Sequence, residues 1–199
     1  MNTPYDVSRV IKEFELNKDF IFFDLGSHIG QELEALLPLG IEVHGFEPHP
    51  KRAELIREKF GNFDNLIFNE KAAWTKNENK IFYHISHGTD MWWYATGSSL
   101  IKEKVNVDKN HTIEVACIDL SEYIFNLQKR INILKIDVEG AEYHIIKHLI
   151  ETKAIEQVDN VFFEDHSERI DSGSVEFFKN KEFVLNEMDK QSARFSNWM

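Results

Sequence analysis

Short apolar runs alternate with segments of helical pattern along most of the chain. Residues 20–23 form an apolar run rich in strand-forming residues, and it stops at a glycine-containing turn. Such a run is typical of a strand that is buried on both faces. A helix is expected next, over about residues 31–37, because the helix-breaking sequence Pro38-Leu-Gly40 follows.

The same alternation continues toward the C-terminus. Further strands are predicted at residues 41–46, 65–68, 131–136 and 160–163. Further helices are predicted at residues 50–60 and 142–150. An irregular stretch over residues 74–108 separates the two halves of this pattern. Strands separated by helices indicate a parallel sheet that is covered on both faces.

The C-terminal part has a weaker pattern. Residues 175–180 look helical, while residues 183–185 and 193–195 could form a closing hairpin. We therefore expect an α/β, Rossmann-like fold with a mostly parallel sheet of about seven strands and helices on both faces. The chain has 199 residues, 42% of them hydrophobic, and shows neither repeat nor linker, so residues 1–199 are expected to form a single domain.

The composition limits the partners and the cellular compartment that we expect for this chain. The sequence shows neither a run of roughly 18 apolar residues nor a basic segment followed by an apolar one, so we expect no membrane partner and no secretion signal. With 34 acidic against 23 basic residues, the formal net charge of −11 disfavours nucleic acid as a partner. The single cysteine, Cys117, is expected as a packed residue inside a strand, which suits a reducing cytoplasm.

The first candidate site is the turn Asp24-Leu-Gly-Ser-His-Ile-Gly30. Its glycines would let a ligand approach the backbone, and the helix after it would offer free N–H groups. The spacing is not the G-x-G-x-x-G of pyrophosphate-binding turns, and Asp24 would repel a phosphate. S-adenosylmethionine (SAM) carries an ammonium and a sulfonium but no phosphate, so it fits this turn better than a dinucleotide does.

A second carboxylate follows the next predicted strand. Glu47 lies roughly twenty residues beyond the first glycine, where an acidic side chain can accept hydrogen bonds from both ribose hydroxyls. The third predicted strand leads into Asn69-Glu-Lys-Ala-Ala-Trp74, whose small residues could lie against adenine. Alternatively, Asp24 is a turn or cap residue, the glycines only satisfy backbone geometry, and Glu47 is a solvated charge.

Ionisable residues also follow the two later strands. Asp137 and Glu139 lie in Lys135-Ile-Asp-Val-Glu-Gly-Ala-Glu142, and Glu164 and His166 end Phe163-Glu-Asp-His166. A hydroxyl that attacks the methyl group of SAM must lose its proton, and Glu139, Glu164 and His166 are unranked candidates for the general base.

Two other readings of these residues remain open. In one, Glu139 and Glu142 cap the following helix while His166 is a turn residue. In the other, the carboxylates and the imidazole hold a divalent metal ion that orients hydroxyl groups.

An aromatic segment lies within the irregular stretch. Trp92, Trp93 and Tyr94 could line an acceptor pocket, because sugars stack on aromatic faces. An equally good interpretation is a surface loop that two tryptophans hold down.

Together these motifs resemble the FkbM family of SAM-dependent methyltransferases. The matching pieces are Phe23-Asp-Leu-Gly-Ser-His-Ile-Gly30, Phe46-Glu-Pro48, Gly97-Ser-Ser-Leu100, Leu134-Lys-Ile-Asp-Val-Glu-Gly-Ala-Glu142 and Phe163-Glu-Asp-His166. The resemblance implies a class I methyltransferase fold and O-methylation, often of sugars, glycans or polyketide-derived compounds. The expected cofactor-binding residues are Asp24, Gly26, Ser27, His28, Gly30, Glu47, Ala72, Ser98, Ser99 and Asp137. The expected catalytic residues are Asp137, Glu139, Glu164 and His166.

Two other functions remain as alternatives. An NAD-dependent oxidoreductase would share the sheet and the ribose-binding carboxylate, but it should carry the G-x-G-x-x-G turn. A non-catalytic SAM- or nucleotide-binding module would have no need for four convergent ionisable groups. We therefore expect a cytoplasmic O-methyltransferase with a small-molecule or glycan substrate, which could be handed over by a glycosyltransferase.

Overall fold

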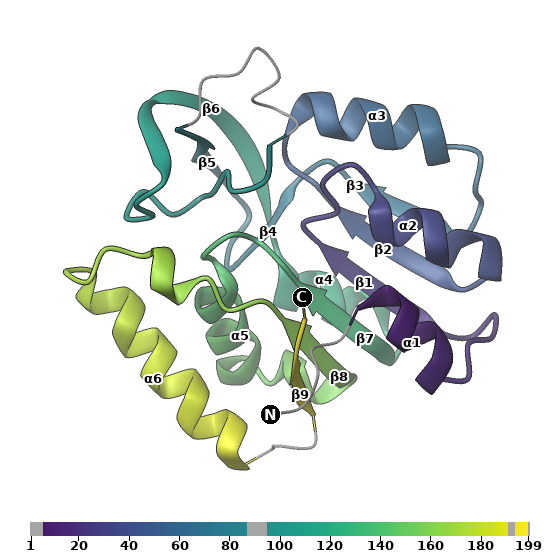
Figure 1. Ribbon diagram of the computed structural model, residues 1–199. Coiled ribbons are helices and arrows are strands. Elements are labelled where there is room, and N and C mark those ends of the chain that lie inside the picture. The colour runs from purple at the N-terminus through teal and green to yellow at the C-terminus, as the bar shows by residue number, and fades with distance from the viewer. Residues whose placement is uncertain (1–5, 87–94, 191–193, 199) are drawn as a thin grey trace.

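The computed structural model describes residues 6–86, 95–190 and 194–198. Its larger sheet has six strands in the order β3-β2-β1-β7-β8-β9, and all neighbouring strands are parallel (Figure 1). The strands are β1 Ile21–Leu25, β2 Glu42–Phe46, β3 Leu66–Asn69, β7 Ile131–Ile136, β8 Val158–Phe163 and β9 Phe195–Asn197. The predicted α/β, Rossmann-like fold is therefore confirmed, with six strands in place of about seven.

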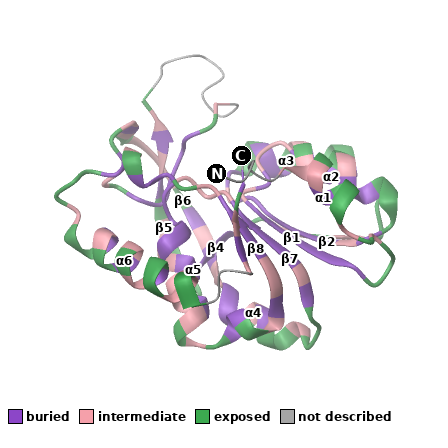
Figure 2. Ribbon diagram, turned by 60° about the horizontal axis from the view of Figure 1, so that its bottom comes forward, coloured by how far each residue is buried: buried purple, intermediate pink, exposed green. Residues whose placement is uncertain are grey.

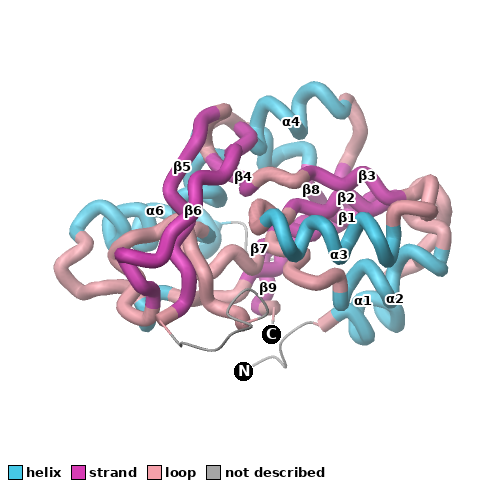
Figure 3. The backbone as a smooth tube through the Cα atoms, turned by 90° about the horizontal axis from the view of Figure 1, so that it is seen from above, coloured by secondary structure: helices cyan, strands magenta, loops and turns pink. Residues whose placement is uncertain are grey.

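Alternating side chains of the strands form two apolar cores, one on each face of the sheet. Phe22 belongs to the core beneath the first three helices, and its neighbour Phe23 belongs to the other. The first face is covered by α1 Val7–Glu13, α2 Gln31–Leu36 and α3 Pro50–Phe60. The opposite core contains residues of α4 Leu120–Leu127, α5 Glu142–Glu151 and α6 Val175–Lys190, and α6 packs against α5. The helix α4 lies on the other side of the larger sheet from α3 (Figure 3).

The central strands are buried along their length (Figure 2), as continuous apolar runs require. Short 3₁₀ helices lie at Leu37–Leu39, Ala154–Gln157 and Ser167–Arg169. Among the described residues, none of the helices is both long and apolar enough to span a membrane.

A second, three-stranded sheet stands beside the larger one, away from α1 and α2 (Figure 2). It consists of β4 Ala72–Trp74, β5 Glu78–Ile85 and β6 Val107–Asp119, in the order β4-β6-β5. The prediction of an irregular stretch was wrong where β5 lies, because its first half is largely exposed and charged and gives no apolar signal. Cys117 lies buried inside β6 as predicted, and burial raises the pKa of its thiol to about 11.

The C-terminal hairpin prediction was wrong. Residues 183–185 lie inside α6, which buries Phe177, Asn180 and Val184 at helical spacing. Three adjacent apolar residues fit either a strand or the buried stripe of a helix, and here the helical stripe continues. Phe195 begins β9, which pairs in parallel with β8, whereas residue 193 lies outside the described residues.

The chain reverses its direction of travel across the sheet between β1 and β7. These strands are neighbours, although Phe22 pairs with Ile133 across 111 positions of sequence. Ligands of open α/β sheets bind at such a switch point, beyond the carboxyl ends of the strands. Gly26, Glu47, Asp137 and Glu164 each follow a strand at this edge.

Candidate active site

A cleft opens at this edge between the larger sheet and the three-stranded sheet. It holds about 610 Å³ of empty space, part of it open to solvent. Seven of the predicted site residues line it, namely Gly26, His28, Glu47, Ala72, Ser98, Asp137 and Glu139. The other six, Asp24, Ser27, Gly30, Ser99, Glu164 and His166, lie outside its lining.

Gly26 brings the turn after β1 against the end of β7. Its φ is +82°, and a Cβ atom built on it would lie 1.9 Å from the backbone oxygen of Asp137. A side chain at this position is therefore excluded both by the backbone conformation and by the space. The backbone N–H groups of Gly26 and Ser27 both donate to the carbonyl of Phe46, 3.0 Å away, which fixes the turn against β2 as well.

Asp24 lies behind this turn and not in the cleft. Its carboxylate is fully buried and accepts a hydrogen bond from Lys135 Nζ at 2.9 Å. Lys135 also donates to the carbonyl of Gly26, 3.3 Å away. The charge that we expected to attract the ammonium of SAM is thus matched by a lysine of the protein, and Asp24 supports the turn.

Ser27 and Gly30 also act on the turn itself. Ser27 Oγ donates to the carbonyl of Asp24 and accepts from the N–H of Phe46, both at 3.1 Å. Gly30, at φ +87°, is the N-cap of α2. Both residues shape the backbone that the cleft exposes at Gly26 and His28.

Glu47 is buried at the cleft wall and is not a solvated charge. Its Oε2 accepts from the N–H of His28 at 3.0 Å, and its Oε1 accepts from the N–H of His49 at 2.8 Å. Burial raises the pKa of Glu47, and Arg52 Nη1, 3.7 Å away, acts in the opposite direction. A carboxylate has about four acceptor positions, so hydroxyl groups of a ligand can still bind.

The facing wall comes from the second sheet and the connection between β5 and β6. Ala72 lines the cleft from β4, and Ser98 lines it from the connection. Ser98 Oγ is buried and has no hydrogen-bond partner among the described residues, so it is available to a polar ligand. Ser99 Oγ instead donates to the carbonyl of Glu139 at 2.7 Å and braces the wall.

Asp137 follows β7 and faces the cleft with about a quarter of its side chain exposed. Burial raises its pKa to about 6, although Lys135, 3.7 Å away, acts in the opposite direction. Near neutral pH the carboxylate is therefore ionised but ready to accept a proton, as a general base must be.

Glu139 has its carboxylate surrounded by cations. Lys104 Nζ contacts it directly, His166 Nε2 lies 3.3 Å away and Arg169 Nη1 lies 3.6 Å away. The residue adopts a φ of +58°, which is uncommon outside glycine. These ion pairs occupy the Glu139 carboxylate with groups of the protein.

His166 is held as a cation. Its Nδ1 lies 2.9 Å from Glu142 and its Nε2 lies 3.4 Å from Glu164. Burial lowers its pKa, but these carboxylates more than compensate and raise it to about 10. The environment thus argues against His166 as the general base, because near neutral pH the ring already carries its second proton. The hydrogen bond from His166 also lowers the pKa of Glu164.

The described hydrogen bonds of Glu142 hold the turn before α5 and not the N-terminus of the helix itself, whose N-cap is Ala141 without a side-chain hydrogen bond. The Glu142 carboxylate accepts from the N–H of Val138 at 3.2 Å and from the N–H of Gly140 at 3.0 Å, just before α5. The negative charge also lies at the positive end of this helix.

The residues that could hold a divalent ion are Asp137, Glu139 and His166, whose ligand atoms lie within 4.8 Å of one another. However, Lys104 and Arg169 already supply positive charge to Glu139, and His166 supplies its own. The described contacts therefore favour an ion-pair cluster at this place.

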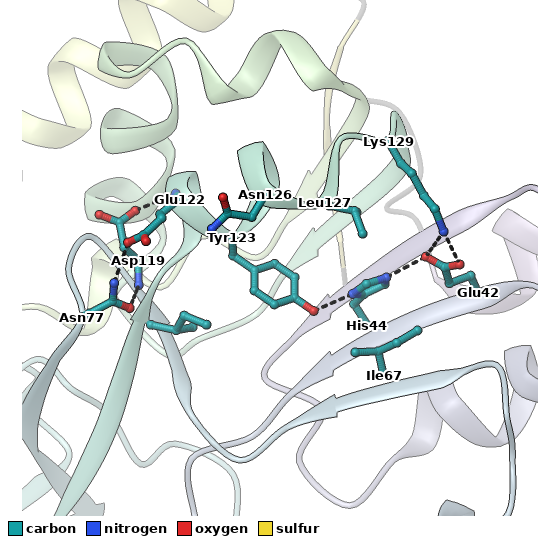
Figure 4. Close-up of a pocket in the computed structure, with 11 residues that line it drawn as sticks. Glu42, His44, Ile67, Asn77, Asp119, Glu122, Tyr123, Asn126, Leu127 and Lys129 are labelled. Atoms are coloured by element: carbon teal, nitrogen blue, oxygen red, sulfur yellow. Dashed lines mark hydrogen bonds and ion pairs between the residues drawn. The ribbon is translucent and has the colours of Figure 1, made fainter.

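A second cavity lies near the start of β2 (Figure 4). His44 connects its two sides, with Nδ1 2.7 Å from Tyr123 Oη and Nε2 2.9 Å from Glu42, which in turn accepts from Lys129. These polar groups satisfy one another, and none of the predicted site residues lines this cavity. The candidate active site is accordingly the cleft at the strand ends.

The sequence patterns missed four charged residues of the site, namely Arg52, Lys104, Lys135 and Arg169. Lys135 is the first residue of the motif that ends at Glu142, but only the fold shows that its ammonium group pairs with the Asp24 carboxylate. The proposed acceptor residues Trp92, Trp93 and Tyr94 lie outside the described residues.

Comparisons with known proteins agree with this arrangement at the level of the family. No curated protein matches the chain. The chain is similar to the crystal structure of yeast methylglyoxal/isovaleraldehyde reductase Gre2 complexed with NADPH, with a TM-score of 0.45 and 11% identity. That similarity covers 89% of this chain and 55% of the reductase. The family model of the methyltransferase FkbM domain matches residues 24–194, which include every predicted site residue, and the chain therefore belongs to the FkbM family of SAM-dependent methyltransferases.

Proposed function

We propose that this protein transfers the methyl group of SAM to a hydroxyl oxygen of a sugar, glycan or related small molecule. The observation that carries the proposal is the placement of Asp137. Two predicted catalytic carboxylates line the cleft at the switch point: among the described residues Asp137 has one ion pair, with Lys135 at 3.7 Å, whereas Glu139 has three. Burial raises the pKa of Asp137 to about 6.

Residues of the cleft suit the cofactor. Glu47 can accept hydrogen bonds from ribose hydroxyls, Ala72 leaves room for a flat base, and Ser98 offers an unused hydroxyl. SAM supplies an electrophilic methyl group on a sulfonium when bound. The Asp137 carboxylate would favour that positive charge, because it lines the same cleft.

Asp137 would remove the proton of the acceptor. Bound SAM would supply the methyl group to the acceptor oxygen, and the Asp137 carboxylate would accept the hydroxyl proton. Glu164 and Arg169, partly exposed beside the cluster, could bind further hydroxyl groups of a sugar. A net charge of −11 supports a small-molecule or glycan acceptor over nucleic acid. The product of a glycosyltransferase is a suitable acceptor.

The test combines binding and turnover. Conversion of SAM to S-adenosylhomocysteine is followed with a panel of free sugars and glycosides for the wild type, Asp137→Asn and the exposed-site control Asp64→Asn. We expect Asp137→Asn to bind S-adenosylhomocysteine within a few-fold of the wild type but to lose roughly 10²–10⁴-fold in turnover. With an active acceptor, the wild-type rate should fall as the pH drops through about 6, because Asp137 becomes protonated.

Calorimetry with S-adenosylhomocysteine and NAD separates the alternatives. Binding of S-adenosylhomocysteine without methylation of any acceptor would favour the non-catalytic module. Binding of NAD alone would favour an oxidoreductase and contradict the proposal.

A further inference from the structure

Lys104 connects two walls of the cofactor cleft from a fully buried position. Its Nζ donates to the carbonyl of Gly97 at 2.8 Å and contacts the carboxylate of Glu139. Gly97 belongs to the connection between β5 and β6, whereas Glu139 belongs to the turn after β7, and both line the cleft. One ammonium group therefore joins backbone and side chain from opposite sides of the site.

One partner of Lys104 has a backbone conformation that needs support. Glu139 has a φ of +58°, which is uncommon for a residue with a side chain and persists only where the surrounding structure holds it. Gly97, at +110°, adopts its positive φ without steric cost. Neighbouring residues add two contacts. Ser99 Oγ donates to the carbonyl of Glu139, and Lys104 forms a β-bridge with Ile170.

A buried lysine contributes little net free energy to the stability of the fold. Desolvating an ammonium offsets most of the attraction to its partner, and apolar residues of similar size often stabilise a core equally well. Glu139 would also keep compensating charge without Lys104, because His166 and Arg169 lie beside it. The contact with the Gly97 carbonyl is what Lys104 adds, and it places Ser98, with its unused hydroxyl, at the cleft.

We propose that Lys104 is a positioning residue for the cofactor, which fixes the Gly97–Ser98 backbone and Glu139 relative to each other so that both walls of the cleft fit SAM. This inference rests on the proposed function, since it assumes that SAM binds in this cleft. It assigns to Lys104 no contact with the reacting atoms.

The test is a double-mutant cycle on affinity for S-adenosylhomocysteine, measured by calorimetry with the full chain. The proteins are the wild type, Lys104→Met, Glu139→Gln and the double variant, with Lys147→Met as the control on a partly exposed ion pair of α5 that lies outside the cleft. We expect Lys104→Met to weaken binding by roughly tenfold or more, as for loss of a charged hydrogen bond. Glu139→Gln should also weaken binding, and the double variant should be no weaker than the worse single variant. Lys147→Met should bind like the wild type.

The outcomes separate the two proposals. Wild-type affinity in a folded Lys104→Met protein would overturn the inference, and so would fully additive losses in the double variant, because Lys104 would then not act together with Glu139. If Lys104→Met does not fold, wild-type affinity in Glu139→Gln overturns the inference by itself. A wild-type protein that binds no S-adenosylhomocysteine would instead contradict the proposed function.

Discussion

Burial acts on Asp137 and His166 in the same sense, yet the two groups end in opposite states. For both, burial disfavours the charged form, which raises the pKa of the carboxyl group and lowers that of the imidazole. Lys135 only partly offsets burial at Asp137, whereas Glu142 and Glu164 reverse its effect at His166. One cluster thus provides a proton acceptor and a fixed cation whose polar atoms lie within 4.8 Å of each other.

A fixed cation at His166 predicts a particular dependence of stability on pH. Its folded-state pKa of about 10 lies above the unfolded value, so its contribution is complete below pH of about 6.5 and is lost as the pH rises toward 10. In urea unfolding between pH 7 and 9.5, the deficit of His166→Gln relative to the wild type should shrink by up to about 1.4 kcal/mol per pH unit.

His84→Gln is the matched control for this experiment. Burial lowers the pKa of His84 to about 4, so the ring is neutral in both states above pH 7 and the deficit of this variant should stay constant. A deficit of His166→Gln that also stays constant would show that the ring is not held as a cation.

The candidate carboxylates could be predicted from sequence because each lies at the end of a buried strand or in the turn that follows it. Lys104 and Arg52 could not be predicted in the same way. Arg52 lies on a surface-type helix, and Lys104 lies in a connection without apolar periodicity. Their charges are buried only because segments that are distant in sequence pack over them. The local sequence pattern does not predict that packing.

Elements were predictable where burial is uniform. The strands β1, β2, β7 and β8 are mostly enclosed by helices on both faces, so apolar runs mark them to within a few residues. The strand β5 is half exposed and carries charges, and therefore gave no signal. For α6 a local apolar triplet suited two structures, and contact with α5 decides between them.

Two glycines at element junctions allow backbone strain to be separated from crowding. Gly26 and Gly40 have nearly equal φ values of +82° and +78°, but a Cβ atom at Gly40 would meet nothing within 4 Å. Gly40→Ala should therefore cost about 1 kcal/mol of unfolding free energy for its left-handed conformation alone. Gly26→Ala should cost roughly 4 kcal/mol or more and abolish binding of S-adenosylhomocysteine, because the turn must move away from Asp137. Both losses of unfolding free energy are measured by chemical denaturation. Equal losses in the two variants would show that the close approach of the two turns does not affect stability.

At the scale of the whole molecule, the cleft depends on two sheets that meet along one edge. Glu47 and Asp137 extend from the six-stranded sheet, and Ala72 belongs to the three-stranded one. A ligand between them contacts both and should stabilise their association.

This arrangement predicts thermal stabilisation by the cofactor product. S-adenosylhomocysteine at a hundredfold excess over its Kd should add about 2.7 kcal/mol of stability. For a chain of this size the gain corresponds to a rise in Tm of roughly 5–10 °C. NAD at the same concentration should leave Tm unchanged, and a larger shift with NAD would contradict SAM as the ligand.

Because β1 and β7 are neighbours in the sheet, the cleft can form only at a late stage of synthesis and folding. Asp24 and Lys135, which join the two strands beneath the glycine turn, lie 111 positions apart in sequence. Closing so long a loop costs chain entropy before any contact repays it, and such non-local pairing is slow. During synthesis, the first glycine turn leaves the ribosome long before its partner strand, so a nascent chain that ends before β7 has no complete cofactor site. A complete cofactor cleft is thus formed only after β7 has been made.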